Sequence, residues 1–594
     1  MKQASISAKH TGTSKNRESL TFPYKLSDRV TGLAKKAEQA DKRAEIVILL
    51  IWSVIHFVVS AFHERWFDEA VSWRIAQNAP IKDILFTLPH YEGHPPFWHL
   101  LLAPFARLGI PYSLSLTFIS FVFMGLTVWL LLYKSPFPRI VRWVLPFTYF
   151  LMYQYGVITR PYCVMSLAFV LLGLFHSERN TKPLRYVLSL ALLCLTSAYG
   201  ILLAGGICIV WGIEILKEKI SAKAVPTLFK DKRFLLLGGL LVLALLLVWE
   251  FRPYPDTYAS TATEETNSFI LRILYMLLVA PLDSLITNIF SYDTRLDYLG
   301  LSALDMIPGC VIGLLFLALI CYFGKKKNTL LYYVIPYGVF AVFSAAVYFF
   351  QHHIGICFLY LMFWGMLTVT SKENRSIAEN SVSATVNSAA VLFGCAAAVI
   401  SAAAGFTACI HDIYQDYAGG KDALAFIQEH DLGTYHVATE WTVLLDDSDE
   451  TKSMPEMLKA CPDISLYAEE VGAYLRADIF DYTFLTPPEH SYIIHRYLTD
   501  DEYENYRAQM EQMPLPDVLI GNNNLHLSSH YFLEPFWGKE AVKNADYKRV
   551  YLKTYRRLWK FGACVNEYYD IYVKAEIAEK LNLPVIPDSD IPLL

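Results

Sequence analysis

Apolar stretches of membrane-spanning length recur along most of this 594-residue chain, and they constrain its fold more than any other feature. A helix needs about 20 apolar residues to cross the hydrocarbon core of a bilayer. Hydrophobic residues make up 54% of the sequence and the mean hydropathy is +0.32, which is too apolar for an ordinary soluble multidomain protein. The sequence therefore predicts a polytopic α-helical membrane protein with eleven transmembrane helices. The predicted spans cover residues 44–62, 112–133, 143–157, 161–176, 185–198, 200–216, 234–250, 300–323, 329–350, 354–371 and 386–408.

The charges between these spans predict how the chain is threaded. Residues 1–43 carry ten Lys or Arg and no apolar run, which is typical of a cytoplasmic tail. The stretch Pro95–Ile110 is ambiguous, but only if it lies along the interface do the basic loops share a side with this tail, as the positive-inside rule requires. These loops are 134–142, 179–185, 217–233, 325–327 and 372–375. We therefore expect a transmembrane domain over 44–409, whose long outer loop, 63–111, contains two interfacial helices.

The chain changes character after the last span. Residues 410–594 are rich in Asp, Glu, Tyr and turn residues and have no spanning run. A helical pattern at Lys421–His430 precedes strand-like segments at Tyr435–Thr439 and Asp517–Ile520, so we predict a soluble α/β domain. An odd number of crossings places it outside the cytoplasm, where Cys461 and Cys564 could form a disulfide that sequence alone cannot assign.

Composition and motifs also exclude some functions. The net charge is −5 and no basic stripe is interleaved with aromatic residues, so nucleic acid is not an expected partner. No C-x-x-C pair and no H-E-x-x-H motif occurs, so the sequence predicts no dedicated metal site, although a divalent cation is compatible with it.

Polar residues of two kinds collect on the predicted outer face. Carboxylates and cationic or titratable side chains meet there, whereas the spans are poor in charge. Displacement at a sugar carbon bearing a lipid-linked phosphate needs both, because a carboxylate takes the proton of the attacking hydroxyl while cations stabilise the departing phosphate. The candidate catalytic residues are Asp68 and Glu69, and the candidate substrate-binding residues are His94, Arg160, Tyr162, His352 and His353.

Three segments together resemble a known family. They are Asp68-Glu69 after the first span, Gly93-His94-Pro95-Pro96-Phe97-Trp98, and Thr159-Arg160-Pro161-Tyr162. This pattern is similar to that of membrane glycosyltransferases of the GT-C fold that use polyprenyl-phosphate sugars, such as protein O-mannosyltransferases and the aminoarabinose transferase of lipid A. The resemblance is good over residues 44–175, fainter to about residue 410, and absent in the C-terminal domain.

The resemblance implies a reaction and a set of roles. It implies transfer, with inversion, from a polyprenyl-phosphate-linked sugar to a glycan, lipid or protein acceptor at the extracytoplasmic face of the cell membrane. Asp68 falls on the position of the catalytic base, and Glu69 completes the acidic pair. His94 stands where the aminoarabinose transferase has a phosphate-binding lysine, and Arg160 matches the Arg of the Arg-Pro-Tyr segment, with Tyr162 in support.

Two histidines depart from the family pattern. Gln351-His352-His353 replaces an Arg-His pair found in many bacterial relatives, so a permanent cation is missing there. His94 likewise has an ordinary pKa near ~6.5 and would need a nearby phosphate to stay protonated at neutral pH. We therefore expect activity to fall as pH rises.

Each of these residues also has a structural interpretation. The two acids could complement a helix dipole, His94 could cap an interfacial helix, and Arg160 could extend to lipid headgroups. For His352 and His353 the structural interpretation is favoured, because adjacent residues on a helix point about 100° apart.

Two other functions remain open from the sequence. A transporter or flippase for a lipid-linked saccharide would use the same cations, but it would need a polar path through the bilayer. A non-catalytic assembly or sensing protein would depend mainly on the C-terminal domain.

Overall fold

The computed structural model describes fourteen parts of the chain, separated by short gaps. They are residues 29, 32–33, 35–41, 43–257, 269–286, 303–347, 349, 351–372, 381–439, 466–482, 492–496, 499–522, 533–560 and 563–587.

Apolar helices dominate the first two thirds of these residues. Seven helical segments are long and apolar enough to cross a membrane. They are formed by α2 (Arg43–Phe62), α7 (Tyr112–Lys134), α11 (Ala198–Ser221), α12 (Lys232–Glu250), the run α13 (Phe269–Leu274), η7 (Tyr275–Val279) and α14 (Ala280–Ile286), α15 (Ala303–Lys326) and α18 (Ser381–Tyr414). Shorter apolar helices are α9 (Tyr162–Phe175), α10 (Pro183–Cys194), α16 (Leu331–Ala346) and α17 (Ile354–Thr370).

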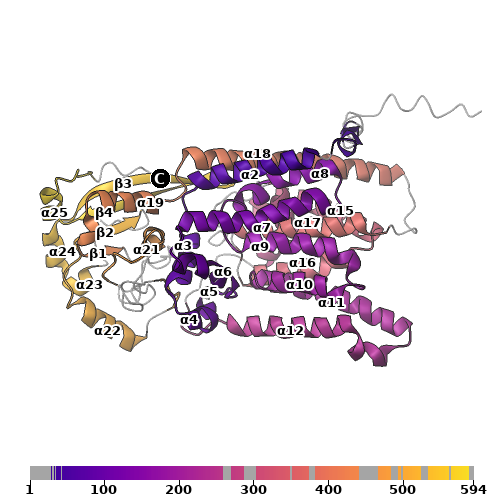
Figure 1. Cartoon of the computed structure of the whole chain (residues 1–594), viewed down its shortest axis with the longest axis horizontal. Helices are drawn as coiled ribbons and strands as arrows, with labels where there is room; N and C mark the ends of the chain where they lie inside the picture. Colours follow the sequence, from indigo (N-terminus) through magenta and orange to yellow (C-terminus); the bar gives the residue numbers. More distant parts are fainter. Residues whose placement is uncertain are drawn as a thin grey trace, which may run out of the picture.

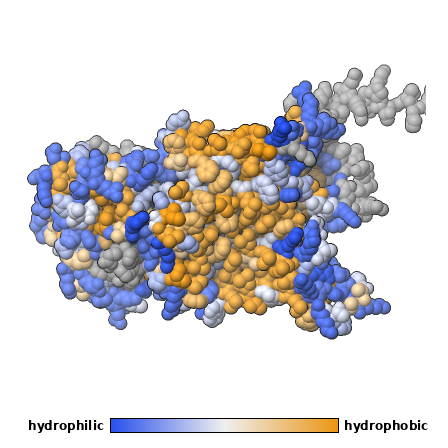
Figure 2. Space-filling view, in the orientation of Figure 1, coloured by the Kyte–Doolittle hydropathy of each residue, from blue (hydrophilic) through white to orange (hydrophobic). Residues whose placement is uncertain are grey.

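The outside of this bundle is apolar. Only 17% of the apolar stretch of α12 is buried inside the protein, and Leu241, Val242, Leu245 and Leu246 are all exposed along this helix. Hydrophobic residues cover the flank of the bundle, while hydrophilic residues cover both of its ends (Figure 2). Soluble monomers rarely expose so large an apolar surface, so a lipid bilayer is its natural surrounding. The chain is a polytopic membrane protein, mostly helical, with a small sheet region.

One predicted span is not a regular helix. Residues 143–157 are divided among α8 (Arg139–Val144), the 3-10 helix η2 (Leu145–Phe147) and the π-helix η3 (Phe150–Gln154). Neighbouring helices satisfy the irregular backbone, since the hydroxyl of Ser401 accepts from the amide of Tyr149 (3.2 Å) and Ser120 donates to the carbonyl of Gly156. Such substitution of partners is what an irregular segment at membrane depth requires.

A second difference is an apolar helical segment between the predicted spans 234–250 and 300–323. The run Phe269–Ile286 packs against α15 and α17. In it, the carbonyl of Met276 accepts a hydrogen bond from Tyr337 (2.7 Å). Arg272 and Asp283 interrupt its hydropathy, which explains why the sequence pattern did not predict it.

The loop 63–111 contains four helices instead of the two predicted. They are α3 (Phe67–Asn78), α4 (Ile81–Phe86), α5 (Pro89–Glu92) and α6 (Phe97–Arg107). With 11 residues, α6 is about 16 Å long, too short to span a bilayer, and it packs against α3. The ambiguous stretch Pro95–Ile110 is therefore a short surface helix.

The C-terminal part is an α/β domain at one end of the bundle (Figure 1). Its four-stranded sheet has the order β1-β2-β4-β3, with β1 (Val437–Thr439) parallel to β2 (Val518–Asn522), and β4 (Ala563–Val573) antiparallel to both β2 and β3 (Lys548–Lys560). The predicted helix and two strands are confirmed, and the β3–β4 hairpin was not predicted. Helices of the domain are α19 (Gly420–Glu429), η9 (Leu432–Thr434), α21 (Leu466–Gly472), α22 (Asp500–Met510), α23 (Glu534–Trp537), α24 (Lys539–Ala545) and α25 (Ala575–Lys580).

The described parts of the basic loops gather at the end of the bundle opposite this domain, together with the start of α2 (Figure 1). Arg139 pairs with Glu45 at the beginning of α2 (2.7 Å), and Arg233 donates to Asn180 (3.2 Å) of the preceding loop. This common end is the arrangement that the charge pattern predicts. Which end faces the cytoplasm stays a prediction, as does the disulfide, because Cys461 lies outside the described residues.

Candidate functional site

The start of α3 places Asp68 at the end of the bundle that contacts the C-terminal domain. Asp68 is the second residue of the helix and forms an ion pair with Arg160, which lies 92 positions later, just before α9. Their side chains are 21% and 14% exposed. Asp68 therefore does more than complement a helix dipole, because a cation from a distant part of the chain holds its carboxylate.

A small hollow lies beside this pair. Its floor comes from the irregular segment before α9, and the guanidinium of Arg160 lies 5.8 Å from the ring centre of Tyr162. The hollow is lined by Trp66, Gln154, Tyr155, Ile158, Arg160, Tyr162 and His352. Three of the five predicted substrate-binding residues are thus in its wall. Trp66, Tyr155 and Ile158 were missed because apolar or aromatic residues beside a span carry no signal of their own, and Gln154 was missed because it belongs to no motif.

The two adjacent histidines have different surroundings. They form η8 (Gln351–His353), where Tyr155 donates to the carbonyl of His352 (2.9 Å) and the Tyr199 hydroxyl lies 3.4 Å from Nδ1 of His353. His353 is 1% exposed and is a packed residue, whereas His352 faces the hollow. Burial, with Arg160 nearby, holds the pKa of both far below the ordinary value, so both are neutral.

His94 lies close to this group without lining the hollow. Gly93 precedes it with φ +64°, a left-handed conformation that favours glycine, and Pro95–Pro96 follow and lead into α6. Its Nδ1 is buried and has no hydrogen-bond partner among the described residues. It is close enough to both histidines of η8 that a positive charge on His94 lowers the pKa of each. Burial lowers the pKa of His94 to about 4, so the protonation expected from an ordinary pKa shifts to lower pH.

Glu69 occupies a very different place from Asp68. Its side chain is fully buried, and it accepts from Arg65 (2.8 Å) and from the backbone amide of Thr159 (2.8 Å), while His63 Nε2 lies 3.2 Å away. Although burial opposes its charge, Arg65 and His63 hold the pKa of Glu69 below its ordinary value. Glu69 therefore holds α3 against the segment that carries Arg160, and its carboxylate is committed to that network.

His63 extends this network to the last apolar helix. Its Nδ1 lies 2.8 Å from Asp412 of α18, which is 349 positions away. Burial alone would lower the pKa of His63, but the carboxylates of Asp412 and Glu69 outweigh it and raise the pKa to about 9. A protonated His63 thus links the loop before Asp68 to α18. Arg65 and His63 were not among the predicted site residues, although they lie just before the acidic pair in the sequence.

The C-terminal domain touches this region directly. Arg557 of β3 is 4% exposed and places its guanidinium 5.6 Å from the ring centre of Trp66, a residue of the hollow. Arg74 of α3 lies 3.5 Å from Glu469 of α21, and Gln77 donates to the carbonyl of Leu475 (3.0 Å). The domain is therefore packed on the same helix that carries Asp68.

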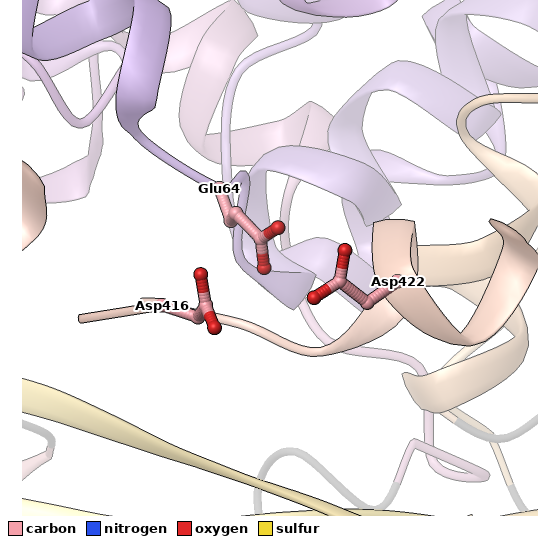
Figure 3. Close-up of side chains that lie close together, drawn as sticks. All are labelled: Glu64, Asp416 and Asp422. Atoms are coloured by element: carbon pink, nitrogen blue, oxygen red, sulfur yellow. The ribbon is translucent and has the colours of Figure 1, made fainter. Parts of the chain in front are cut away.

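One acidic group among the described residues has the spacing of metal ligands. Glu64, Asp416 and Asp422 each offer one oxygen, and these oxygens all lie within 4.8 Å of one another (Figure 3). The sequence predicted no dedicated metal site, because Glu64 is far from Asp416 and Asp422 in the chain and the three residues match no motif.

No protein-family model matches the chain, and no curated protein matches its sequence. Among solved structures, it is similar to the arabinofuranosyltransferase AftD from mycobacteria, with a TM-score of 0.34 and 13% sequence identity. The match covers 90% of this chain and 40% of that one, so the chain spans well under half the length of the neighbour. At this TM-score the likeness carries no argument about function.

Proposed function

We propose that this chain is an integral membrane glycosyltransferase of the GT-C type, which moves a sugar from a polyprenyl-phosphate donor to an acceptor at the extracytoplasmic face. The observation that carries the proposal is the ion pair of Asp68 and Arg160 at the edge of a hollow, at one end of an apolar bundle. It joins, in one place, a carboxylate that can accept a proton and a cation that can hold a phosphate.

The reaction assigns a separate task to each partner. An acceptor hydroxyl gives its proton to Asp68 while its oxygen forms the new bond to the anomeric carbon. The bond from that carbon to the phosphate oxygen breaks, and the electron pair stays with the lipid phosphate. Arg160 stabilises this anion, and His94, which is neutral in the free protein, contacts the same phosphate and takes up a proton from solvent only under the phosphate's charge. One carboxylate is enough for such a single displacement, which agrees with the structural position of Glu69.

Donor binding would change the partner of Arg160. Before binding, Arg160 pairs with Asp68. The phosphodiester of the donor carries one negative charge, as a carboxylate does, and its two free oxygens match the guanidinium fork, so it would compete with Asp68 for Arg160. Asp68 would then be free to accept the proton, and the base would be released only when the donor is in place.

The test replaces Asp68 by Asn in the full-length protein in sealed lipid vesicles, with a panel of polyprenyl-phosphate-linked hexoses and pentoses. We expect product formation to fall by about 10² to 10⁴-fold while binding of polyprenyl phosphate persists. Unchanged transfer by D68N would refute the proposal. Movement of lipid across the bilayer by both proteins, without product, would instead favour a flippase.

Sidedness has its own test, in a parent protein whose Cys461 and Cys564 are replaced by Ser. Asp431 and Lys223 are exposed, the first in the C-terminal domain and the second in the basic loop before α12. We expect a membrane-impermeant thiol reagent to label D431C, and not K223C, in intact cells. The reverse pattern would place Asp68 on the cytoplasmic side and end the proposed topology.

A further inference from the structure

A group of three carboxylates lies where the helical bundle meets the C-terminal domain (Figure 3). Glu64 follows α2, Asp416 follows α18, and Asp422 is in the first turn of α19. One oxygen of each lies within 4.8 Å of the other two, and the three carboxylates point toward one another. Oxygens bound to one Ca²⁺ at about 2.4 Å lie up to about 4.8 Å apart, so one cation could contact all three.

Glu64 gives an independent sign that a ligand belongs here. It is 6% exposed, and its Oε2 is buried without a hydrogen-bond partner among the described residues. A buried carboxylate without a partner is unfavourable unless a proton or a cation neutralises it.

Lys553 already neutralises part of the group. Its Nζ lies 2.7 Å from Asp416 and also pairs with Asp422, but it makes no described ion pair with Glu64. A single ammonium cannot balance three carboxylates. The Lys553 side chain is 33% exposed on β3, and its flexible stem can carry Nζ into solvent when another cation enters.

We propose that Glu64, Asp416 and Asp422 bind a hard divalent cation, with Ca²⁺ as the best fit. All three ligands are carboxylates, which suit Ca²⁺, Mg²⁺ or Mn²⁺ better than Zn²⁺. Ca²⁺ accepts irregular oxygen geometry, whereas Mg²⁺ demands a near-ideal octahedron. The cation would fasten the loop before α3 to the first residues of the C-terminal domain. This site does not depend on the proposed transferase activity.

The experiment uses the purified full-length protein, stripped with a chelator and without donor or acceptor. Tb³⁺ is titrated as a luminescent probe, excited through Trp66 and Tyr417, which lie close in sequence to the ligands, and Ca²⁺ is then added as competitor. We expect saturable Tb³⁺ luminescence that Ca²⁺ displaces, and a rise in apparent melting temperature of about 2–5 °C at millimolar CaCl₂.

Variants separate this site from non-specific binding. We expect E64Q to lower the affinity for Ca²⁺ at least tenfold. K553Q should raise this affinity severalfold, because the competing ammonium of Lys553 is gone. The matched control is E511Q. Glu511 is an exposed acid that pairs with Arg507 at the end of α22, so the E511Q protein should bind Ca²⁺ as the wild type does. Without Ca²⁺, E64Q should melt no lower than the wild type, since it loses an unpaired charge.

Two results would overturn the site. One is a wild-type protein whose Tb³⁺ signal and melting temperature do not respond to millimolar Ca²⁺. The other is an E64Q protein that responds as fully as E511Q does. If E64Q does not fold, D422N serves the same purpose, because its side chain is 33% exposed and less integral to the core. Neither failure touches the role proposed for Asp68.

Discussion

Asp68 and Glu69 are consecutive acids in one helix, and each pairs with an arginine, but the surroundings of the two pairs differ. The side chains of Asp68 and Arg160 are 21% and 14% exposed and lie beside a hollow, whereas those of Glu69 and Arg65 are both 0% exposed. Consecutive helix residues point about 100° apart, so one acid meets Arg160, a residue of the hollow's wall, and the other is enclosed in the bundle. The open pair can exchange partners during a reaction, and the buried pair holds the geometry in which it does so.

The largest effect should come from breaking the buried pair. E69Q leaves Arg65 and a protonated His63 without their shared carboxylate, so we expect the free energy of unfolding to fall by about 3–5 kcal/mol. Unfolding by SDS in mixed micelles measures it. D68N is the matched control, with an expected loss below about 1 kcal/mol. Equal losses in both variants would remove the distinction between the two pairs.

The role of the partly exposed pair Asp68–Arg160 in donor binding can be tested by introducing a permanent positive charge at position 94. His94 is neutral at pH 7.5 because its pKa is about 4, so H94K should bind polyprenyl phosphate about tenfold more tightly. The difference in affinity between H94K and the wild type should shrink as pH falls toward 4, where the wild-type His94 becomes protonated. Microscale thermophoresis at several pH values measures both affinities.

The control for this change is H90K, in the same loop, where His90 stacks on Tyr254 at 3.9 Å. H90K should leave the affinity unchanged. A gain in H94K that is constant from pH 4 to pH 8 would contradict the pKa assigned to His94.

A smaller effect should follow from loosening the contact between the C-terminal domain and the hollow. Arg557 places its guanidinium against Trp66 and Tyr417, and lysine cannot stack in this way. We expect R557K to lose about 1 kcal/mol of stability, measured by SDS unfolding. R556K, at the exposed neighbouring position, should be neutral, and a similar loss there would indicate a general effect on β3.

The smallest effect concerns the competition for Arg160. D68N removes the charge that holds Arg160 in the free protein, so polyprenyl phosphate should bind about threefold more tightly, as the modest strength of a partly exposed pair implies. Titration of binding with the isolated lipid phosphate measures it. Weaker binding by D68N would show that Asp68 helps to hold the donor instead of competing with it.

Much of the fold could be predicted from the sequence because hydropathy and charge are local signals. Every predicted span except 143–157 is an apolar helix in the structure. That segment is apolar like the others, but Pro146 lies in it and its backbone relies on Ser120 and Ser401 from other helices. The β3–β4 hairpin was missed because shifts of register near Arg549 and Leu558 break the alternation that marks a strand.

The candidate site was predicted in part for the same reason. Short motifs identified Asp68, Arg160 and Tyr162, and the structure brings them together with His352 beside one hollow. The burial of Glu69 could not be predicted from the motif, because it depends on contacts with distant segments, such as the amide of Thr159, 90 positions later. The link from His63 to Asp412 spans 349 positions and leaves no pattern in the sequence.

By itself the sequence determined that this chain is a membrane protein, where its basic loops lie, and which short segments could carry chemistry. Each of these follows from the free energy of transferring residues between water and lipid, which depends on local composition. Only the tertiary structure decided which of two adjacent acids is enclosed, which cation each one meets, and that Glu64 lies with Asp416 and Asp422. Those outcomes depend on contacts between segments that are distant in the sequence, such as Asp68 with Arg160, 92 positions later, and His63 with Asp412, 349 positions later, and packing sets them.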